Sequence, residues 1–223
     1  MTAGRASRAA HALVAACAAT GVALHYLVVL GHHGEVALRS VRFLSYFTIL
    51  TNMLVAVSGL AIAAGRGRFA VLAARPAWRA AVTLDILVVA LVYHLLLRNV
   101  TLPGAIGGTA NALVHQLVPA AWTICWLLFP PHGAIDRAAP WRWLLYPLGF
   151  ALWTLLHGAI GGWYPYPFMD AARLGYPTML ANILAIGVLF LGLGYGLRWV
   201  DGRLGIPRAS GIVPAETGIS ERR

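Results

Sequence analysis

Six apolar segments, each close to the length of a bilayer-spanning helix, limit how this chain can fold more than any other feature. Such a helix needs about 20 apolar residues, because all its backbone polar groups must be satisfied internally. We place the segments at 9–30, 43–64, 78–97, 107–129, 142–161 and 177–199. Short connections join them into one compact unit. The sequence therefore predicts an all-α fold, with a six-helix transmembrane bundle over residues 1–200 and a polar, disordered tail at 201–223.

Composition also indicates a membrane protein. Hydrophobic residues make up 60% of the chain and charged residues 11%, and the mean hydropathy is +0.74. An ordinary soluble domain carries about 25% charged residues. We therefore expect an integral, multi-pass membrane protein.

The arginines predict the orientation of the bundle. All 17 basic residues are arginine, and the net charge is +10. Four arginines lie in the odd-numbered connections, and the other thirteen lie in the two tails and the even-numbered connections. Because cytoplasmic loops carry the arginine excess, both termini are predicted to be cytoplasmic. The charge then faces anionic headgroups, so membrane lipids are expected partners and nucleic acid is not.

Four histidines fall inside the predicted helices, where ionisable side chains are costly and often functional. They are His25, His94, His115 and His157, on four different segments. With cytoplasmic termini and a rise of about 1.5 Å per residue, each lies roughly 5 to 12 Å below the outer surface. This common depth predicts a polar pocket that opens toward the outer leaflet. Each histidine taken singly also fits an ordinary hydrogen bond between helices.

The second segment carries polar residues at a similar depth. Ser45, Thr48, Thr51 and Asn52 are three or four residues apart, so they share one face if the segment is one helix. Such side chains often bond back to carbonyls of their own helix, which is the structural alternative to a site. A stripe of this kind in an apolar segment must find polar partners.

A hydroxyl and an imidazole at this depth can form a catalytic pair. A hydroxyl is a weak nucleophile at its own pKa, and a neutral imidazole within hydrogen-bond reach lets it attack an acyl carbon. Asn111 lies four residues before His115, on the same helix face, where it can fix the ring's orientation. We predict that Thr48 and His115 form this pair, which requires neither a metal nor a cofactor.

The connection after the fifth segment, from Gly161 to Asp170, is dense in aromatic residues and proline. Aromatic rings favour the headgroup level, so one interpretation is an interfacial belt. The other is a stiff cap over the outer pocket, because two prolines limit the freedom of the backbone. In the second interpretation Asp170 anchors the cap or caps the next helix.

Four motifs, in an order that spans nearly all six segments, carry a family resemblance. They are YFTILTN at 46–52, NALVH at 111–115 with Pro119, WLLFPPHG at 126–133, and YPFMD at 166–170. Together they resemble the bacterial branch of the androgen-induced protein family, multi-pass proteins whose animal members are membrane threonine hydrolases. One departure is Ala112, where animal members tend to carry a second histidine.

The resemblance implies hydrolysis of lipid esters, in animals esters of a fatty acid with a hydroxy fatty acid. It implies a threonine nucleophile and a histidine on separate helices, which Thr48 and His115 match, and a location in a bacterial inner or plasma membrane. We therefore expect a membrane acyl-ester hydrolase whose lipid ester substrate enters from the outer leaflet. Eight further residues are expected to contact the substrate or to donate to an oxyanion: Ser45, Thr51, Asn52, His94, Asn111, His157, Tyr166 and Asp170.

Two other function classes stay open. Histidines at one depth on several helices also suit a haem-binding electron-transfer protein, with two of them as axial ligands. Transmembrane electron transfer favours two layers of histidines, and the sequence has one. The third class is a transporter or a partner-binding scaffold. The segments show neither a clear inverted repeat nor a helix broken at mid-membrane, which disfavours a transporter.

Overall fold

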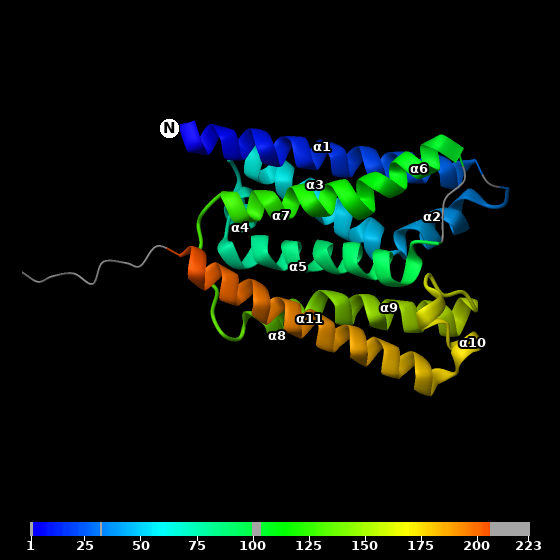
Figure 1. Cartoon of the computed structure of the whole chain (residues 1–223). Coiled ribbons are helices and arrows are strands. Elements are labelled where there is room, and N and C mark those ends of the chain that lie inside the picture. The colour runs from blue at the N-terminus through cyan, green and yellow to red at the C-terminus, as the bar shows by residue number, and fades with distance from the viewer. Residues whose placement is uncertain (1, 32, 100–103, 206–223) are drawn as a thin grey trace, which may run out of the picture.

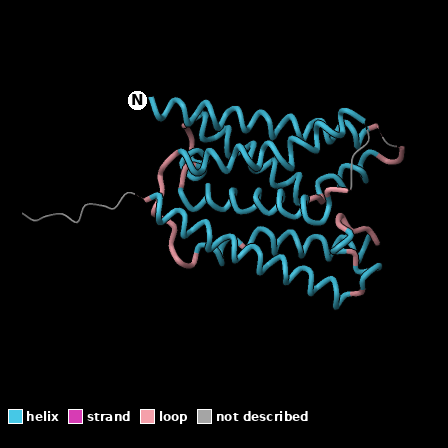
Figure 2. The backbone as a smooth tube through the Cα atoms, viewed as in Figure 1, coloured by secondary structure: helices cyan, strands magenta, loops and turns pink. Residues whose placement is uncertain are grey.

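A computed structural model describes residues 2–31, 33–99 and 104–205, and every regular element within these ranges is a helix (Figure 2). Six helical spans are long and apolar enough to cross a membrane: Gly4–Leu30, Phe47–Ala64, Pro76–Leu97, Gly104–Leu128, Ala139–Gly161 and Tyr176–Leu204. They match the six predicted segments to within a few residues. The prediction of an all-α six-helix bundle in a multi-pass membrane protein is therefore confirmed.

The helices run nearly side by side, and loops join them at the two ends of the bundle (Figure 1). In chain order they are α1 (Thr2–Leu30), α2 (Val36–Leu44), α3 (Phe47–Ala64), α4 (Arg68–Ala73), α5 (Pro76–Val92), η1 (Tyr93–Leu97), α6 (Gly104–Ala112), η2 (Leu113–Leu117), α7 (Val118–Leu128), α8 (Ala139–Trp143), α9 (Leu145–Gly161), η3 (Pro167–Met169), α10 (Ala171–Leu174) and α11 (Tyr176–Leu204). The start of α1 and the end of α11 lie at the same end of the bundle. We call this the inner end and the opposite one the outer end.

Small residues allow α1 to approach its neighbours closely. A Cβ atom added at Gly59 of α3 would lie 2.7 Å from the carbonyl oxygen of His11, and one at Gly21 would lie 2.8 Å from a methyl group of Val114. Membrane helices pack through such small residues because lipid offers no hydrophobic drive for helices to associate. The close packing of α1 on α3 and on α6 and η2 follows from these contacts.

The predicted second segment is two helices and not one. The amide of Ser45 donates to the carbonyl of Arg42, which closes α2, and Tyr46 has an extended backbone with φ −93° and ψ 126° before α3 begins. The Ser45 hydroxyl donates to the carbonyl of Val41 and accepts from the indole of Trp153. The prediction that Ser45 shares a helix face with Thr48 is therefore wrong, because these contacts hold a break that no proline or glycine marks.

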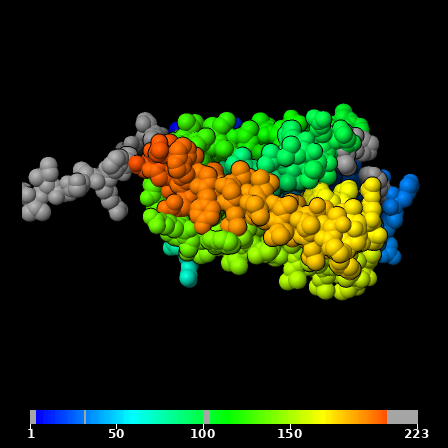
Figure 3. All heavy atoms as spheres, turned by 60° about the horizontal axis from the view of Figure 1, so that its bottom comes forward, coloured from blue at the N-terminus to red at the C-terminus, as the bar shows by residue number. Residues whose placement is uncertain are grey.

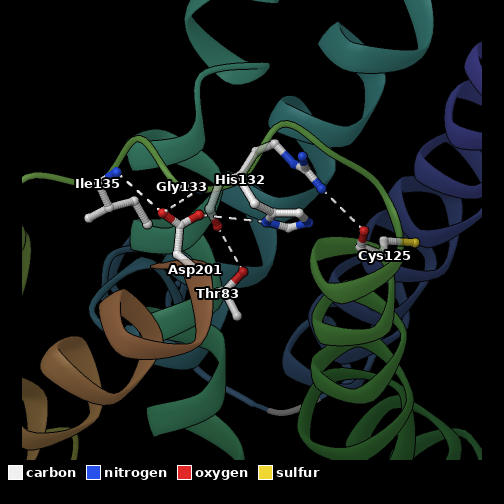
Figure 4. A network of polar contacts seen from close by, with 7 residues as sticks. Thr83, Cys125, His132, Gly133, Ile135 and Asp201 are labelled. Atoms are coloured by element: carbon white, nitrogen blue, oxygen red, sulfur yellow. Dashed lines mark hydrogen bonds and ion pairs between the residues drawn. The ribbon is translucent and has the colours of Figure 1, made fainter. Parts of the chain in front are cut away.

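A buried carboxylate joins α11 to the loop after α7 at the inner end (Figure 4). Asp201 is 1% exposed, and its Oδ2 accepts from the amides of Gly133 at 2.9 Å and Ile135 at 3.2 Å. Its Oδ1 lies 3.6 Å from Nδ1 of His132. Because α11 continues to Leu204, the predicted start of the tail at residue 201 is too early. Asp201 belongs to the folded part, since its carboxylate accepts from loop amides that would otherwise lack a partner.

Beside this carboxylate, a second set of hydrogen bonds joins α5 to α7 (Figure 4). Thr83 of α5 accepts a hydrogen bond from the indole of Trp122 and donates to the carbonyl of Arg79, whose guanidinium donates to the carbonyl of Cys125. The two sets of contacts tie the inner ends of three spans together. The predicted disorder of residues 206–223 lies outside the described residues.

Candidate active site

His115 lies in a widened helical turn. The fourth span is α-helical on both sides of η2, a π-helical turn that contains His115. Pro119, four residues later, has no N–H for the His115 carbonyl, and its ring crowds that carbonyl, which favours local widening. A second π-helical turn, η1, follows α5 and contains Tyr93 and His94. Such turns are frequent at functional sites.

Thr48 and His115 face each other across the interface of α3 and η2. Thr48 lies in the first turn of α3, and its Oγ1 is 3.4 Å from Nε2 of His115. Nδ1 of His115 is 3.2 Å from the backbone oxygen of Asn111. A carbonyl can only accept, so Nδ1 carries the proton and Nε2 of the neutral ring offers its lone pair to the Thr48 hydroxyl. The structure thus brings the predicted pair together in the tautomer that a general base requires.

An aromatic ring fixes the plane of the imidazole. Tyr93 stacks on His115 with a centroid separation of 4.1 Å and an interplanar angle of 18°. The side-chain amide of Asn111 donates to the Tyr93 hydroxyl at 2.6 Å. The backbone carbonyl of Asn111 therefore orients His115, whereas the Asn111 side chain, which the four-residue spacing placed beside the ring, instead holds the stacking tyrosine. Sequence reasoning missed Tyr93, which carried no signal beyond a position next to His94.

Asn52 joins the two elements that carry the pair. It is fully buried, and its Nδ2 donates to the carbonyls of Thr48 at 2.8 Å and Val114 at 3.2 Å. Both donor hydrogens bind backbone oxygens of the protein. The predicted contact of Asn52 with substrate is not favoured by this burial, and the residue instead positions Thr48 relative to η2.

A cavity of about 150 Å³, which we call the polar cavity, lies beside the pair at the outer end. It has room for several water molecules. Its lining comes from α1, α3, η1, the α6–η2 turn and the outer loop, and includes His25, Thr48, Tyr93, Asn111, His115 and Tyr166. Pro165 and Pro167 also line it, so the aromatic loop covers this cavity, as the cap interpretation predicts.

A second cavity of about 90 Å³, the apolar cavity, lies between α5, α9 and α11. Thr48, Leu97 and Tyr166 line both cavities, and His115 lines only the polar one. The Thr48 side chain therefore stands at the boundary between a space with hydrogen-bonding groups and a space lined almost entirely by carbon.

Tyr166 contacts the main chain of Thr48. Its hydroxyl accepts from the Thr48 amide at 3.4 Å, and the ring is 7% exposed. Burial raises the pKa of Tyr166 to about 12, and the contacts with Thr48 lower the pKa by less. The phenol is therefore protonated at neutral pH, and its hydrogen is available to a group bound beside Thr48. Tyr166 was predicted from the sequence as a site residue, and the structure places it there.

Neither protein-family models, nor curated proteins, nor solved structures give a match to this chain. The family resemblance stays a prediction carried by the four motifs.

Three predicted site residues lie away from the pair and are engaged elsewhere. The Thr51 hydroxyl is 3.2 Å from the hydroxyl of Tyr146, on the side of α3 that faces α9. Asp170 caps α10, where its Oδ1 accepts from the amides of Ala172 and Arg173. Ser45 precedes the break before α3. Their predicted substrate contacts were inferred from residue spacing along one helix, or from a position in the outer loop. Spacing does not determine where a side chain points once the helix is interrupted, as it is at Ser45 and Tyr46.

The four histidines separate into different environments. His25 and His115 line the polar cavity, whereas Nδ1 of His94 lies 2.7 Å from the carbonyl of Ala90 and the ring borders an outside groove. His157 packs against Trp153 and Trp163, and its Nδ1 lies 3.2 Å from the Trp163 carbonyl. Direct contact of His94 and His157 with a substrate at Thr48 is not favoured by these positions. Only His25 and His115 of the four histidines line the same cavity. These positions do not test haem binding, so the haem hypothesis stays a prediction.

Proposed function

We propose that this chain is an integral membrane hydrolase that cleaves fatty acyl esters, with Thr48 as nucleophile and His115 as general base. The observation that carries the proposal is the 3.4 Å separation of Thr48 Oγ1 and His115 Nε2, in a ring whose other nitrogen is held by a backbone carbonyl. Nucleophile, base and orienting group in this order are the arrangement that activates a hydroxyl. Active sites without substrate commonly hold such a pair at the long end of hydrogen-bond reach.

In the first step the Thr48 oxygen attacks the ester carbonyl carbon, and its proton passes to Nε2 of His115. The carbonyl oxygen becomes an oxyanion. The bond between the carbonyl carbon and the alcohol oxygen then breaks, and His115 returns the proton to the departing alcohol. The products of this step are a free alcohol and an acyl ester of Thr48.

The oxyanion requires donors beside Thr48. Thr48 is the second residue of α3, where the helix dipole favours negative charge. The Tyr166 hydroxyl lies against this turn and keeps its proton at neutral pH. The amides of Thr48 and Ile49 already donate to the Tyr166 hydroxyl and the Tyr46 carbonyl. We therefore assign oxyanion stabilisation to the Tyr166 O–H, with the α3 dipole adding to it. One such donor typically supplies about 3 to 4 kcal/mol of the barrier reduction.

The second step hydrolyses the acyl-threonine. Water in the polar cavity attacks the acyl carbon while His115 again takes the proton. The bond to Thr48 Oγ1 breaks, the proton returns to that oxygen, and a fatty acid is released. The polar cavity, which His115 and Asn111 line, is the side from which water reaches the acyl carbon.

Hydrolysis of lipid and p-nitrophenyl esters by purified protein tests the proposal. We expect turnover by the wild type and its loss, by a factor of about 10³ or more, in both Thr48→Ala and His115→Ala. Thr123→Ala and His33→Ala are matched controls, because these side chains lie away from both cavities. Turnover that persists in both site variants would remove the assignment. A Soret band in a protein without ester hydrolysis would favour the haem hypothesis instead.

A further inference from the structure

The apolar cavity is formed by side chains of the helical bundle itself. Its walls are aliphatic and aromatic side chains of α5, α9, α11 and the outer loop, such as Val88, Val92, Ala151, Phe168, Ile186 and Phe190. The cavity runs along α11 from Ile183 to Phe190, seven residues or roughly 10 Å of helix. Thr48 and Tyr166 contribute the polar atoms at one place in its wall. A ligand that fills this space therefore has an apolar body and one polar group at Thr48.

Helix packing explains why the space exists. α11 packs closely on α5 and α8, whereas the backbone of α9 lies further from α3, α5 and α11. Phe47, Phe150 and Phe190 meet edge to face in the intervening region with centroids 5.1 and 6.0 Å apart. Gly187 of α11 leaves the wall open, since a Cβ atom there would meet no atom within 4 Å.

The position of His115 decides which part of an ester this cavity receives. His115 must protonate the leaving alcohol oxygen, so that oxygen has to lie on the side of Thr48 where Nε2 points. His115 lines the polar cavity and not the apolar one. The acyl chain, attached to the other side of the carbonyl carbon, is thereby directed into the apolar cavity.

We propose that the apolar cavity is the acyl-chain site of this protein, that it takes one fatty acyl chain with its carbonyl at Thr48, and that the polar cavity takes the alcohol part. This inference rests on the proposed hydrolase function for the direction in which the ester lies. The walls are about as apolar as lipid, so an acyl chain can pass from the bilayer into the cavity without exposing its methylenes to water.

The acyl site also approaches the lipid-facing surface. Leu148 of α9 lines the cavity and is 55% exposed, so on this side a single side chain separates the cavity from the outside of the bundle. Figure 3 shows the neighbouring face, where α11 crosses the surface as a ridge and meets the outer loop at one end. A chain can therefore enter sideways from the bilayer without passing through water.

Gly187 is the residue that we expect to limit chain length. It lies between Ile183, nearer the outer end of α11, and Phe190, and a side chain at this position projects into the open part of the wall. Gly192 on the same helix also has open space at its Cβ position, but it is exposed and outside the cavity. The two glycines form a matched pair for substitution.

The first test compares p-nitrophenyl esters from acetate to palmitate. Gly187→Leu should lower kcat/KM for the long-chain esters by about tenfold or more, while the value for acetate stays within about twofold of wild type. Gly192→Leu should keep the wild-type profile. An equal loss at all chain lengths in Gly187→Leu, or the same shift in Gly192→Leu, would overturn the acyl site even if hydrolysis itself is real.

The second test does not need turnover. A fatty acid with a terminal diazirine is photolysed with Thr48→Ala protein, and the adducts are mapped by mass spectrometry. The acyl site predicts adducts on cavity residues such as Ile186 and Phe190, with reduced yield in Gly187→Leu. Adducts confined to the lipid-facing residues Leu184 and Val188 would overturn it. If wild type hydrolyses no ester but the cavity is labelled, the hydrolase proposal fails and the chain-binding site remains.

Discussion

Thr48 and His115 are 67 positions apart in the chain, and their Oγ1 and Nε2 atoms lie 3.4 Å from each other. The imidazole approaches Thr48 from the polar cavity, while the apolar cavity reaches the same side chain from between α5, α9 and α11. One hydroxyl thus meets a base on one side and an apolar space on the other. An enzyme that separates an acyl chain from an alcohol needs this division.

Replacing Tyr166 by phenylalanine tests the oxyanion assignment. The variant keeps the ring that lines both cavities and removes only the hydroxyl next to the Thr48 amide. We expect kcat to fall by about 10²- to 10³-fold with little change in KM, because the donor acts on charge that develops in the transition state. Tyr164→Phe, the same change in the same loop, should retain activity. Equal kcat in both variants would remove Tyr166 from the mechanism.

The alkaline limit of activity follows from the pKa of Tyr166, which burial raises to about 12. The phenol donates only while it is protonated, so the donor is present below that pKa and is lost above it. We expect kcat to hold its plateau past about pH 10, the ordinary tyrosine value. Blank-corrected rates measured between about pH 8 and pH 11 check this. A loss of kcat centred near pH 10 in wild type but not in Tyr166→Phe would contradict the burial effect.

The stacked ring of Tyr93 is predicted to be a positioning residue. Tyr93→Leu removes the stack on His115, and Tyr93→Phe keeps it while losing only the bond from Asn111. An aromatic contact of this kind contributes about 0.5 to 1.5 kcal/mol, so kcat should fall about three- to tenfold in Tyr93→Leu and less in Tyr93→Phe. KM should change little in either. The idea fails if the phenylalanine variant loses as much kcat as the leucine variant.

Asp201 is expected to matter for stability and not for catalysis, because it lies in the last turn of α11 at the inner end, whereas Thr48 lies in the first turn of α3 at the other end (Figure 1). Asp201→Ala leaves the amides of Gly133 and Ile135 without their acceptor. An unsatisfied buried donor costs about 1 to 3 kcal/mol, so the free energy of unfolding should fall by that order. Thermal unfolding in detergent measures this, with the exposed Asp136→Asn in the same loop as control. Unchanged unfolding in Asp201→Ala would show that the bonds contribute nothing.

The architecture could be predicted from the sequence because a lipid environment leaves few choices. Twenty apolar residues in a row must form a helix there, so the six spans were found with errors of a few residues. The break at Ser45 and Tyr46 escaped prediction, since contacts with Trp153 and the α2 carbonyls hold it and no local signal marks it. Asp201 was assigned to the tail because its partners are backbone amides of a loop far away in the chain, and no sequence pattern indicates such contacts.

The residue types of the candidate site could be predicted from the sequence, but the directions in which their side chains point were harder to predict. A hydroxyl and a histidine at one depth indicated the pair. The four-residue spacing of Asn111 and His115 brought the two residues together, but the backbone carbonyl of Asn111 and not its side chain contacts the imidazole. Helix spacing did not reveal that Thr51 faces Tyr146. The role of Tyr93 depends on the packing of one span against another, which a single sequence does not encode in any local pattern.

Covalent labelling of the nucleophile tests the central claim most directly. Purified wild-type protein is treated with a fluorophosphonate that carries an alkyl chain, then digested, and the modified residue is identified by mass spectrometry. We predict a single adduct on Thr48, absent from Thr48→Ala and much reduced in His115→Ala, because only a base-activated hydroxyl reacts rapidly. An adduct on another residue such as Ser45, or equal labelling of Thr48 with and without His115, would contradict the account.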